Sequence, residues 1–354
     1  MKRTSMNFKR FALSGLFVIM LTILTACGGV KASSEAAEKH ECQVFAMDTI
    51  MMLTAYGENG EAALADAESV IYGLEEDLDP ENPWGSVYNM NLRAGEYVSV
   101  SDDCISIMLT TLGHWNASGG ALDPALYPII LAWGFTTGEH RVPPQTEING
   151  LLADKNTEGI LVDEEGEKIY IPAGTKVSLG AVGKGYTAQK ALEVMEEAGV
   201  ESAIVSLGGN VQTLGDTKPN GDKWQVAVTD PHDTGSYVGI LSIGEAAVVT
   251  SGGYQRYFEQ DGVTYIHIID PATGYPVDND LLSVTVVTKD GGVADCLSTA
   301  LFVMGCEGAL EYYRHAGGFE MVLITEENEV IVTPGLGEAF SESGKGYTYA
   351  YPAA

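Results

Sequence analysis

One segment in the middle of the chain constrains the fold more than any other. It consists of a predicted strand at Lys176–Leu179, a glycine-rich turn at Gly180–Lys184, a helix at Gly185–Ala198 and a second strand at Ser202–Leu207. Gly199 follows the helix, at the position where a left-handed residue often ends one. The N-terminus of a helix presents backbone N–H groups that favour anions. The segment is therefore the clearest supersecondary unit of the chain, a strand–turn–helix–strand, with a candidate anion-binding turn at the start of its helix.

The turn Ser178–Tyr186, with the sequence SLGAVGKGY, matches no common nucleotide-binding loop. Lys184 is followed by Gly185 and Tyr186 instead of the Ser or Thr that a P-loop uses for magnesium, and the dinucleotide pattern G-x-G-x-x-G is absent. The chain also lacks a G-x-S-x-G elbow, an H-E-x-x-H pair and a zinc-site spacing among Cys42, Cys104, Cys296 and Cys306. These absences argue against P-loop NTPases, Rossmann dehydrogenases, ordinary serine hydrolases and zinc proteases. Taken alone, a glycine-rich turn is more often structural than ligand-binding.

The first 26 residues have the composition of a secretory signal. Four basic residues precede the apolar segment Phe11–Leu24, which is short for a membrane span. The segment closes on Leu24-Thr25-Ala26-Cys27, which resembles the lipobox of bacterial lipoproteins, where the cysteine becomes the lipid-bearing N-terminus. We expect a signal peptide over residues 1–26, a lipid-anchored flexible tether over residues 27–43 and a folded body over residues 44–354 on the extracytoplasmic side of the membrane. The alternative is an apolar helix that stays as the anchor.

The charge of the chain excludes one class of partner. The formal net charge is −30, and removal of the signal, with its four basic residues and no acids, leaves 15 basic against 49 acidic residues, or −34. Nucleic acid is therefore not expected as a partner, because binding of a phosphate backbone depends on basic side chains. An anionic substrate would also be repelled by the overall field. Phosphate chemistry in such a protein would have to rely on a local metal ion and on backbone donors.

The remaining sequence predicts further helices and strands around the central segment. Helices are expected at Glu61–Leu78, between Ser101 and Gly119, near Thr146–Asp154, at Ala294–Met304 with a stop at Gly305, and at Glu307–Ala316. Strands are expected at Val44–Tyr56, Trp224–Thr229, Tyr237–Ile243, Ala247–Thr250, Thr264–Asp270 and Ser283–Thr288, and a closing hairpin joins Phe319–Thr325 to Glu329–Thr333.

Two features between Val248 and Leu301 carry candidate chemistry. Asp295 and Thr299, at i and i+4, share one face of the expected helix, and their oxygens suit a hard cation. The alternative for Asp295 alone is a helix N-cap. His267 alternates with Tyr265 and Ile269 on the expected strand, where a lone histidine is most often a hydrogen-bonded structural residue. Their separation in the sequence leaves the relation between the histidine and the acid open.

In combination, the motifs of this chain resemble those of the ApbE family, the flavin transferases (FAD:protein FMN transferases). The resemblance runs from about Val44 to Gly305 in the family's order, through AMDT, GALDPALYPIILAWGF, SLGAVGKGYTAQKAL, VSLGGNV, WQVAVTDP, VVTSGGYQRYF, HIIDPATGYP and ADCLSTALFVMG. The resemblance implies an α+β fold of two lobes with FAD in the groove between them. The lipobox is also in keeping with this family, many of whose members are lipoproteins.

The resemblance further implies the roles of individual residues. Asp295, Thr299 and the backbone carbonyl of Ala181 would be ligands of Mg²⁺. The flavin nucleotide would be lined by Met47, Ala121, Leu122, Asp123, Ser178, Lys184 and Ile269. His267 would be the catalytic base that activates a Thr or Ser hydroxyl of an extracytoplasmic acceptor flavoprotein, which attacks the FMN-side phosphorus of FAD as AMP leaves. The acceptor would belong to an electron-transfer system.

Two departures and two alternatives accompany this interpretation. The family commonly has Asp where this chain has Ser178 and Thr where it has Ala125, and the region Asp79–Asn91 matches poorly. If water replaces the protein hydroxyl, the same residues would make an FAD pyrophosphatase that releases FMN and AMP. A non-catalytic flavin-binding lipoprotein is the third reading, against which the presence of His267, Asp295 and Thr299 weighs.

Overall fold

The computed structural model describes residues 37–352. The predicted signal peptide, Cys27 and the first part of the predicted tether lie outside the described residues. The last part of that tether prediction is wrong, because strand β1 begins at Lys39 and runs to Ala46. Residues 39–43 pair with β2, and Cys42 packs against the core, so the folded body starts before the expected boundary at Val44.

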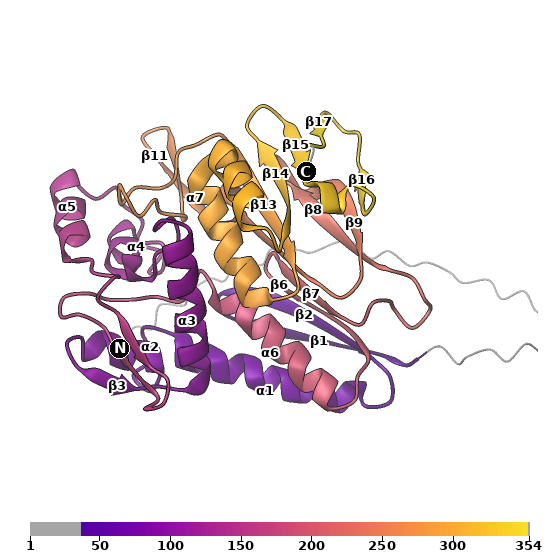
Figure 1. Cartoon of the computed structure of the whole chain (residues 1–354), viewed down its shortest axis with the longest axis horizontal. Coiled ribbons are helices and arrows are strands. Elements are labelled where there is room, and N and C mark those ends of the chain that lie inside the picture. Colours follow the sequence, from indigo (N-terminus) through magenta and orange to yellow (C-terminus); the bar gives the residue numbers. More distant parts are fainter. Residues whose placement is uncertain (1–36, 353–354) are drawn as a thin grey trace, which may run out of the picture. The chain divides into compact units, whose positions relative to one another are not determined.

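A nine-stranded sheet forms the larger lobe (Figure 1). Its order is β1 (Lys39–Ala46), β2 (Thr49–Tyr56), β6 (Ser202–Leu207), β7 (Asn210–Leu214), β10 (Ala247–Gly252), β13 (Leu281–Thr288), β14 (Glu320–Thr325), β15 (Glu329–Val332) and β17 (Thr348–Ala350). Neighbouring strands are antiparallel except β15 and β17, which are parallel. The closing hairpin and the second strand of the central segment are as predicted.

Both faces of this sheet are covered. Three helices pack on one face: α1 (Gly60–Leu78), α6 (Gly183–Glu197) and α7 (Gly291–Ala316). A three-stranded sheet of β8 (Trp224–Asp230), β9 (Asp233–Ile243) and β16 (Phe340–Glu342) covers the other. Successive side chains of β10 show the division, since Val249 packs with α7 and Val248 packs against β8 and β9. Among the described residues only α7 is long and apolar enough to span a membrane, and 56% of its apolar window is buried inside the protein.

A second lobe of shorter elements lies beside the larger one and meets α7 through helix α3 (Asp102–Ala117) (Figure 1). Its other elements are α2 (Ser86–Leu92), β3 (Tyr97–Ser99), η1 (Pro124–Leu126), α4 (Tyr127–Trp133), α5 (Gln145–Asp154), β4 (Leu161–Asp163), β5 (Lys168–Tyr170), η2 (Gly253–Gln255), β11 (Tyr257–Gln260) and β12 (Val263–Ile266). The short helix η3 (Pro334–Leu336) lies near the end of the chain. The predicted α+β class is confirmed.

Two predicted strands are wrong, each for a local reason. Val44–Tyr56 is a hairpin, because Met47 and Asp48 turn the chain with φ of 49° and 58°. Such a turn usually carries Asn-Gly or Asp-Gly, so Met-Asp gave no signal. Lys176–Leu179 pairs with no strand: Asn91 replaces the neighbour, accepting from the Val177 amide at 2.7 Å and donating to its carbonyl at 2.8 Å.

The helix that carries Asp295 begins earlier than predicted. Asp290 caps α7 by accepting from the amide of Val293 at 2.8 Å, so Asp295 is not the N-cap. The predicted break at Gly305 is confirmed, since this residue has a φ of 74° and a ψ of 177° within α7. The carboxylate of Asp280 accepts from the amide of Cys306 at 2.9 Å and so satisfies a donor that the break exposes.

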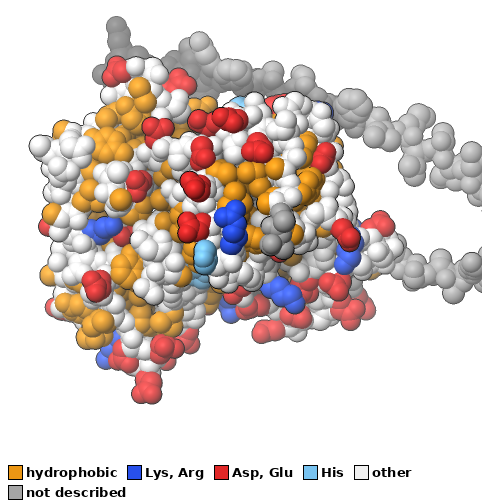
Figure 2. Space-filling view, turned by 45° about the horizontal axis from the view of Figure 1, so that its top comes forward, with side chains coloured by type: hydrophobic (Ala, Val, Ile, Leu, Met, Phe, Trp, Pro, Cys, Tyr) orange, Lys and Arg blue, Asp and Glu red, His pale blue; other side chains and the backbone are white. Residues whose placement is uncertain are grey.

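The strand that leads to His267 is shorter than predicted. β12 ends at Ile266, so His267 lies in the segment after the strand rather than on it. From Ile268 to Val277 the chain forms a second, irregular hairpin, with a bridge between Ile269 and Pro276. The face of the molecule in Figure 2 carries many acidic and few basic side chains, in keeping with the charge of the sequence.

Candidate active site

The first turns of α6 and α7 cross in close contact. A Cβ added to Gly185 would lie 2.1 Å from the carbonyl oxygen of Gly291, and one added to Gly291 would lie 2.0 Å from Nε2 of Gln212. Gln212, on β7, donates from that nitrogen to the carbonyl of Gly185 at 2.7 Å. Only glycine fits either position, so the glycine-rich turn is set directly against the helix that carries Asp295 and Thr299.

Asp295 is a buried carboxylate at this crossing. Its side chain accepts from the amide of Gly185 at 2.8 Å, and the residue is only 5% exposed. Burial raises the pKa of Asp295, while the charge of Lys184 and the Gly185 hydrogen bond oppose that rise. A buried carboxylate of this kind is stabilised in its charged form by a nearby cation.

The oxygen donors around Asp295 fit a hard cation. Thr299 lies one turn further along α7, and its Oγ1 is 3.3 Å from Oγ of Ser251 on β10, which is in turn 2.9 Å from Oγ of Ser298. Ala181 is half-buried in the turn before α6. The described residues contain no group of three or more His, Cys, Asp or Glu side chains that could hold a metal ion. A cation here would therefore depend on one carboxylate and on neutral oxygens, donors that Mg²⁺ accepts and zinc sites seldom use.

His267 is held by the backbone carbonyl of Arg256. Its Nδ1 lies 3.1 Å from the carbonyl oxygen of Arg256, and its own amide donates to the same oxygen at 3.0 Å. This contact makes Nδ1 the protonated nitrogen and leaves Nε2 as an acceptor. Burial, and then the charges of Lys184 and Arg256, lower the pKa of His267 to about 4. The imidazole is therefore neutral at physiological pH.

Lys184 influences the charge states of both Asp295 and His267. Its positive charge lowers the pKa of both Asp295 and His267, so all three side chains act within one electrostatic neighbourhood at the start of α6. The charge of Lys184 thus acts on both the imidazole and the carboxylate, although 28 positions separate these two residues in the sequence. Such a cluster, at a helix N-terminus, is suited to an anionic ligand with a transferable proton nearby.

Met47 contacts helices α1 and α6. Its amide donates to Oε1 of Glu75 at 2.5 Å, and Oγ1 of Thr187 is 3.9 Å from its sulfur. The next residue, Asp48, pairs with the guanidinium of Arg256 at 3.3 Å. The strained Met47-Asp48 turn is therefore tied both to α6 and to the residue whose carbonyl holds His267, and non-glycine residues of positive φ often mark functional sites.

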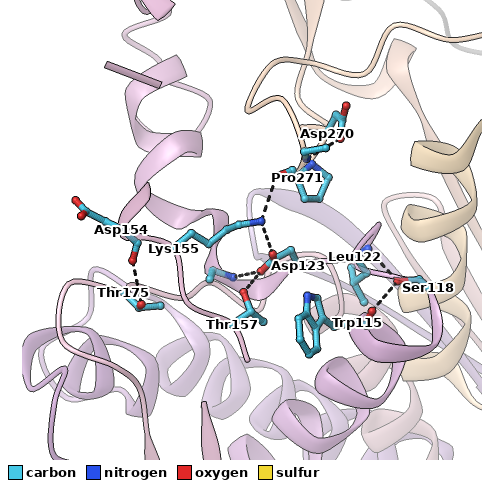
Figure 3. Close-up of polar contacts among 12 residues, drawn as sticks. Trp115, Ser118, Leu122, Asp123, Asp154, Lys155, Thr157, Thr175, Asp270 and Pro271 are labelled. Carbon is cyan, nitrogen blue, oxygen red and sulfur yellow. Dashed lines mark hydrogen bonds and ion pairs between the residues drawn. The ribbon is translucent and has the colours of Figure 1, made fainter. Parts of the chain in front are cut away.

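Asp123 is engaged by the protein itself (Figure 3). Its Oδ1 accepts from the amide of Ala125 at 2.9 Å and from Oγ1 of Thr157 at 2.6 Å, and its Oδ2 pairs with Nζ of Lys155 at 2.7 Å. Leu122 is buried in the core of the second lobe, whereas Ala121 is half-buried. A nucleotide would therefore meet this run through Ala121 or the backbone rather than through the Asp123 carboxylate.

Ser178 and Ile269, the two remaining residues predicted to line the flavin, also make their contacts within the protein. The amide of Ser178 donates to the carbonyl of Pro124 at 2.9 Å, and its Oγ accepts from the amide of Gly180 at 3.3 Å. Ile269 is buried with Trp133 and Ile148, so its side chain faces the core. Ser178 joins the glycine-rich turn to the run that contains Asp123, which brings two motifs together that the sequence could not connect.

Several polar residues of the site carried no sequence signal of their own. Lys155, Thr157 and Gln212 each make a contact described above and lie outside the motifs quoted from the sequence. Ser251 and Arg256 lie within the motif VVTSGGYQRYF, which gave neither of them a role. Asn210 was visible only as the end of a Gly-Gly-Asn turn. Within residues 37–352 its buried Nδ2 has no hydrogen-bond partner, so it leaves a donor two residues from Gln212. A buried donor without a partner is costly unless a ligand or water completes it.

The sequence model of the ApbE family matches residues 47–323. The chain belongs to the ApbE family. It is 31% identical over 304 residues to the FAD:protein FMN transferase of Klebsiella pneumoniae (strain 342), covering 85% of this chain and 94% of the relative. It is 29% identical over 343 residues to that of Treponema pallidum (strain Nichols), covering 91% and 93%.

Solved ApbE structures share the fold. The ApbE protein of Thermotoga maritima superposes with a TM-score of 0.76 at 28% identity, covering 82% of this chain and 95% of the other. The ApbE flavin transferase of Vibrio cholerae superposes with a TM-score of 0.73 at 27% identity, covering 82% and 94%. The comparisons make this ApbE protein an enzyme of a transferase family whose named members move FMN from FAD to protein.

Proposed function

We propose that this ApbE protein transfers FMN from FAD to a Thr or Ser hydroxyl of an acceptor protein, in a reaction that depends on Mg²⁺. The observation that carries the proposal is the cluster at the start of α6, where the Gly185 amide donates to the buried carboxylate of Asp295 and the charge of Lys184 acts on both that carboxylate and the neutral imidazole of His267. A diphosphate between them would meet positive charge, helix N-terminal amides and a proton acceptor together.

The residues of the chain supply three functions in this reaction. Lys184 and the amides at the start of α6 would hold the diphosphate of FAD. Asp295, Thr299 and the carbonyl of Ala181 would hold Mg²⁺, which when bound neutralises charge on the diphosphate. Nε2 of His267 would accept the proton of the acceptor hydroxyl as its oxygen bonds to the FMN-side phosphorus, and the bond from that phosphorus to the AMP oxygen breaks. AMP leaves, and a phosphoester links FMN to the acceptor.

The low pKa of His267 is consistent with this role once substrate charge is included. In the protein alone, burial and two cations lower the pKa to about 4, which makes the imidazole a weak base. A diphosphate beside Lys184 would neutralise part of that positive charge and raise the pKa toward the working pH. The base would therefore become effective when the substrate is bound, and general-base assistance is worth ~10²–10⁴-fold in rate.

An incubation with FAD, Mg²⁺ and a candidate acceptor tests the proposal. The full chain should add the mass of FMN to the acceptor and release AMP in equal amount, and a chelator should stop both. AMP and free FMN without acceptor labelling would instead identify an FAD pyrophosphatase. Bound but unchanged FAD would identify a flavin-binding protein, and either outcome would contradict the transferase proposal.

We further propose that the enzyme is a lipoprotein that acts on flavoproteins outside the cytoplasm. The support is the sequence Leu24-Thr25-Ala26-Cys27 after a basic and an apolar segment. The mature protein should begin at a lipid-modified Cys27 and partition with membranes, and Cys27→Ser should remain unprocessed or become soluble. Recovery of unmodified wild-type protein in the cytoplasm would contradict this location.

A further inference from the structure

We propose that Lys155 is a positioning residue of the reaction, which fixes the hairpin after His267 to the ligand-lining run at Asp123. The inference rests on the proposed function, because it concerns the placement of His267. Lys155 follows α5 and donates from Nζ to two acceptors, Oδ2 of Asp123 at 2.7 Å and the carbonyl oxygen of Pro271 at 3.1 Å (Figure 3). These acceptors belong to segments far apart in the sequence.

The segment that contains Pro271 is closed by its own backbone hydrogen bonds. The amide of Asp270 donates to the carbonyl of Tyr275 and the amide of Gly274 to that of Asp270, both at 2.8 Å. The amide of Val277 donates to the carbonyl of Ile268 at 2.9 Å. We call residues 268–277 the Asp-Pro hairpin. His267 is the residue directly before it, so a movement of the hairpin tip at Pro271 is transmitted to the imidazole.

Packing alone does not fix where this hairpin sits. Trp133 donates from Nε1 to the carbonyl of Gly274 at 2.9 Å, and its ring lies 5.2 Å from that of Tyr275. Ile269 packs in the same cluster. The Trp133 bond and the apolar contacts hold the hairpin at Gly274 and Ile269, whereas the ammonium of Lys155 makes two directed bonds that join the tip to Asp123. Lys155 therefore supplies the element that sets the position of the tip relative to Asp123.

The environment of the ion pair makes this contact hard to replace. The side chain of Asp123 is 2% exposed and that of Lys155 is 20% exposed. Without the ammonium, a buried carboxylate would keep only Thr157 and the Ala125 amide, and the carbonyl of Pro271 would lose its donor. Water that enters to solvate both groups would displace the hairpin. A displacement of about 1 Å at a reacting group can cost ~10²-fold in rate.

The test compares three variants of the full chain with the wild type. In Lys155→Met, kcat should fall ~10–100-fold while the KM for FAD changes much less, because the base is misplaced after substrate has bound. Lys155→Arg should restore most of kcat, since a guanidinium can reach the same two acceptors. Arg141→Met is the matched control, because it removes an exposed ion pair with Glu147 on α5, the helix that Lys155 follows, and should leave kcat unchanged.

A second measurement does not depend on turnover. Hydrogen exchange at the amides of Gly274 and Val277 should accelerate in Lys155→Met and not in Arg141→Met. If Lys155→Met fails to fold because it leaves the carboxylate of Asp123 buried without its ammonium partner, a double variant replaces it. Asp123→Asn, Lys155→Met removes this charge and should show the same faster exchange at Gly274 and Val277. Unchanged exchange, or a kcat equal to that of Arg141→Met, would overturn the inference. An inactive wild type would overturn the proposed function instead, and the exchange data would still decide the role of Lys155.

Discussion

At the scale of single residues, the site depends on groups whose charge states are set by their surroundings. Asp295 is an acid that burial disfavours in its charged form, and His267 is a base that burial keeps neutral. Lys184 favours the charged acid and the neutral imidazole at once. One ammonium therefore favours the charge states that the proposed phosphoryl transfer requires of Asp295 as a cation ligand and of His267 as a proton acceptor.

Replacement of Asp295 should abolish dependence on the metal. Asp295→Asn keeps the size of the side chain and a carbonyl acceptor for the Gly185 amide, but it removes the charge that would bind Mg²⁺. We expect Mg²⁺-dependent turnover to fall by more than ~10²-fold, since metal stabilisation of phosphoryl transfer is worth several kcal/mol. Mg²⁺ should also raise the melting temperature of the wild type and not of the variant. Full Mg²⁺-dependent activity in Asp295→Asn would exclude this metal site.

The role of His267 as a base predicts both a rate and a pH profile. His267→Ala should lower kcat ~10²–10⁴-fold and leave the affinity for FAD nearly unchanged. In the wild type, activity should be lost as the pH falls through the pKa of the imidazole, because the protonated form cannot accept a proton. The free-enzyme limb, seen in kcat/KM, should lie near the value of about 4, and the limb in kcat should lie at higher pH because bound diphosphate raises the pKa. A rate that does not change across this range would contradict the assignment.

Lys184 offers an independent check of the same arrangement. After burial, its charge is the next cause of the low pKa of His267. In Lys184→Met the imidazole should therefore titrate at higher pH than in the wild type, as followed by NMR of its ring protons in the absence of substrate. Lys176→Met, outside the cluster, serves as the control. An unchanged pKa of His267 in Lys184→Met would show that the ammonium of Lys184 does not act on the imidazole.

At the scale of elements, the crossing of α6 and α7 is what assembles the site. Gly185→Ala would place a Cβ 2.1 Å from the backbone of Gly291, and backbone atoms cannot yield as a flexible side chain does. We expect a loss of at least ~1–3 kcal/mol in the free energy of unfolding, together with loss of Mg²⁺ binding. Gly73→Ala on α1 is the matched control, because no atom lies within 4 Å of the added Cβ, and it should stabilise by up to ~1 kcal/mol. A Gly185→Ala protein as stable as the wild type would show that the helices can separate.

Elements with strong local patterns could be predicted from the sequence, and elements set by distant partners could not. The helix that carries Asp295 and its break at Gly305 follow from apolar spacing and a glycine. The sequence does not predict the Met47-Asp48 turn, because its residues are unusual for positive φ. The strand predicted at Lys176–Leu179 is wrong, because the side-chain amide of Asn91 makes the hydrogen bonds that a neighbouring strand would make. Motifs pointed to Asp295 and His267, but Lys155 and Asp123 meet across 32 positions, a contact that no local pattern encodes.

At the scale of the whole molecule, the formal net charge of −30, which would become −34 on removal of the predicted signal, opposes the approach of FAD, which is itself an anion. Screening should therefore assist binding. The Debye length falls from ~30 Å at 0.01 M to ~8 Å at 0.15 M ionic strength, so distant acids cease to act while Lys184 at the site still does. We expect the association rate constant of FAD, followed by quenching of flavin fluorescence at fixed free Mg²⁺, to rise several-fold over this range. The dissociation rate constant should change less, because it reports contacts at short distance. A fall in the association rate with added salt would mean that Lys184, Arg256 and the bound cation dominate the field at the entrance, and that the acidity of this protein is arranged away from its site.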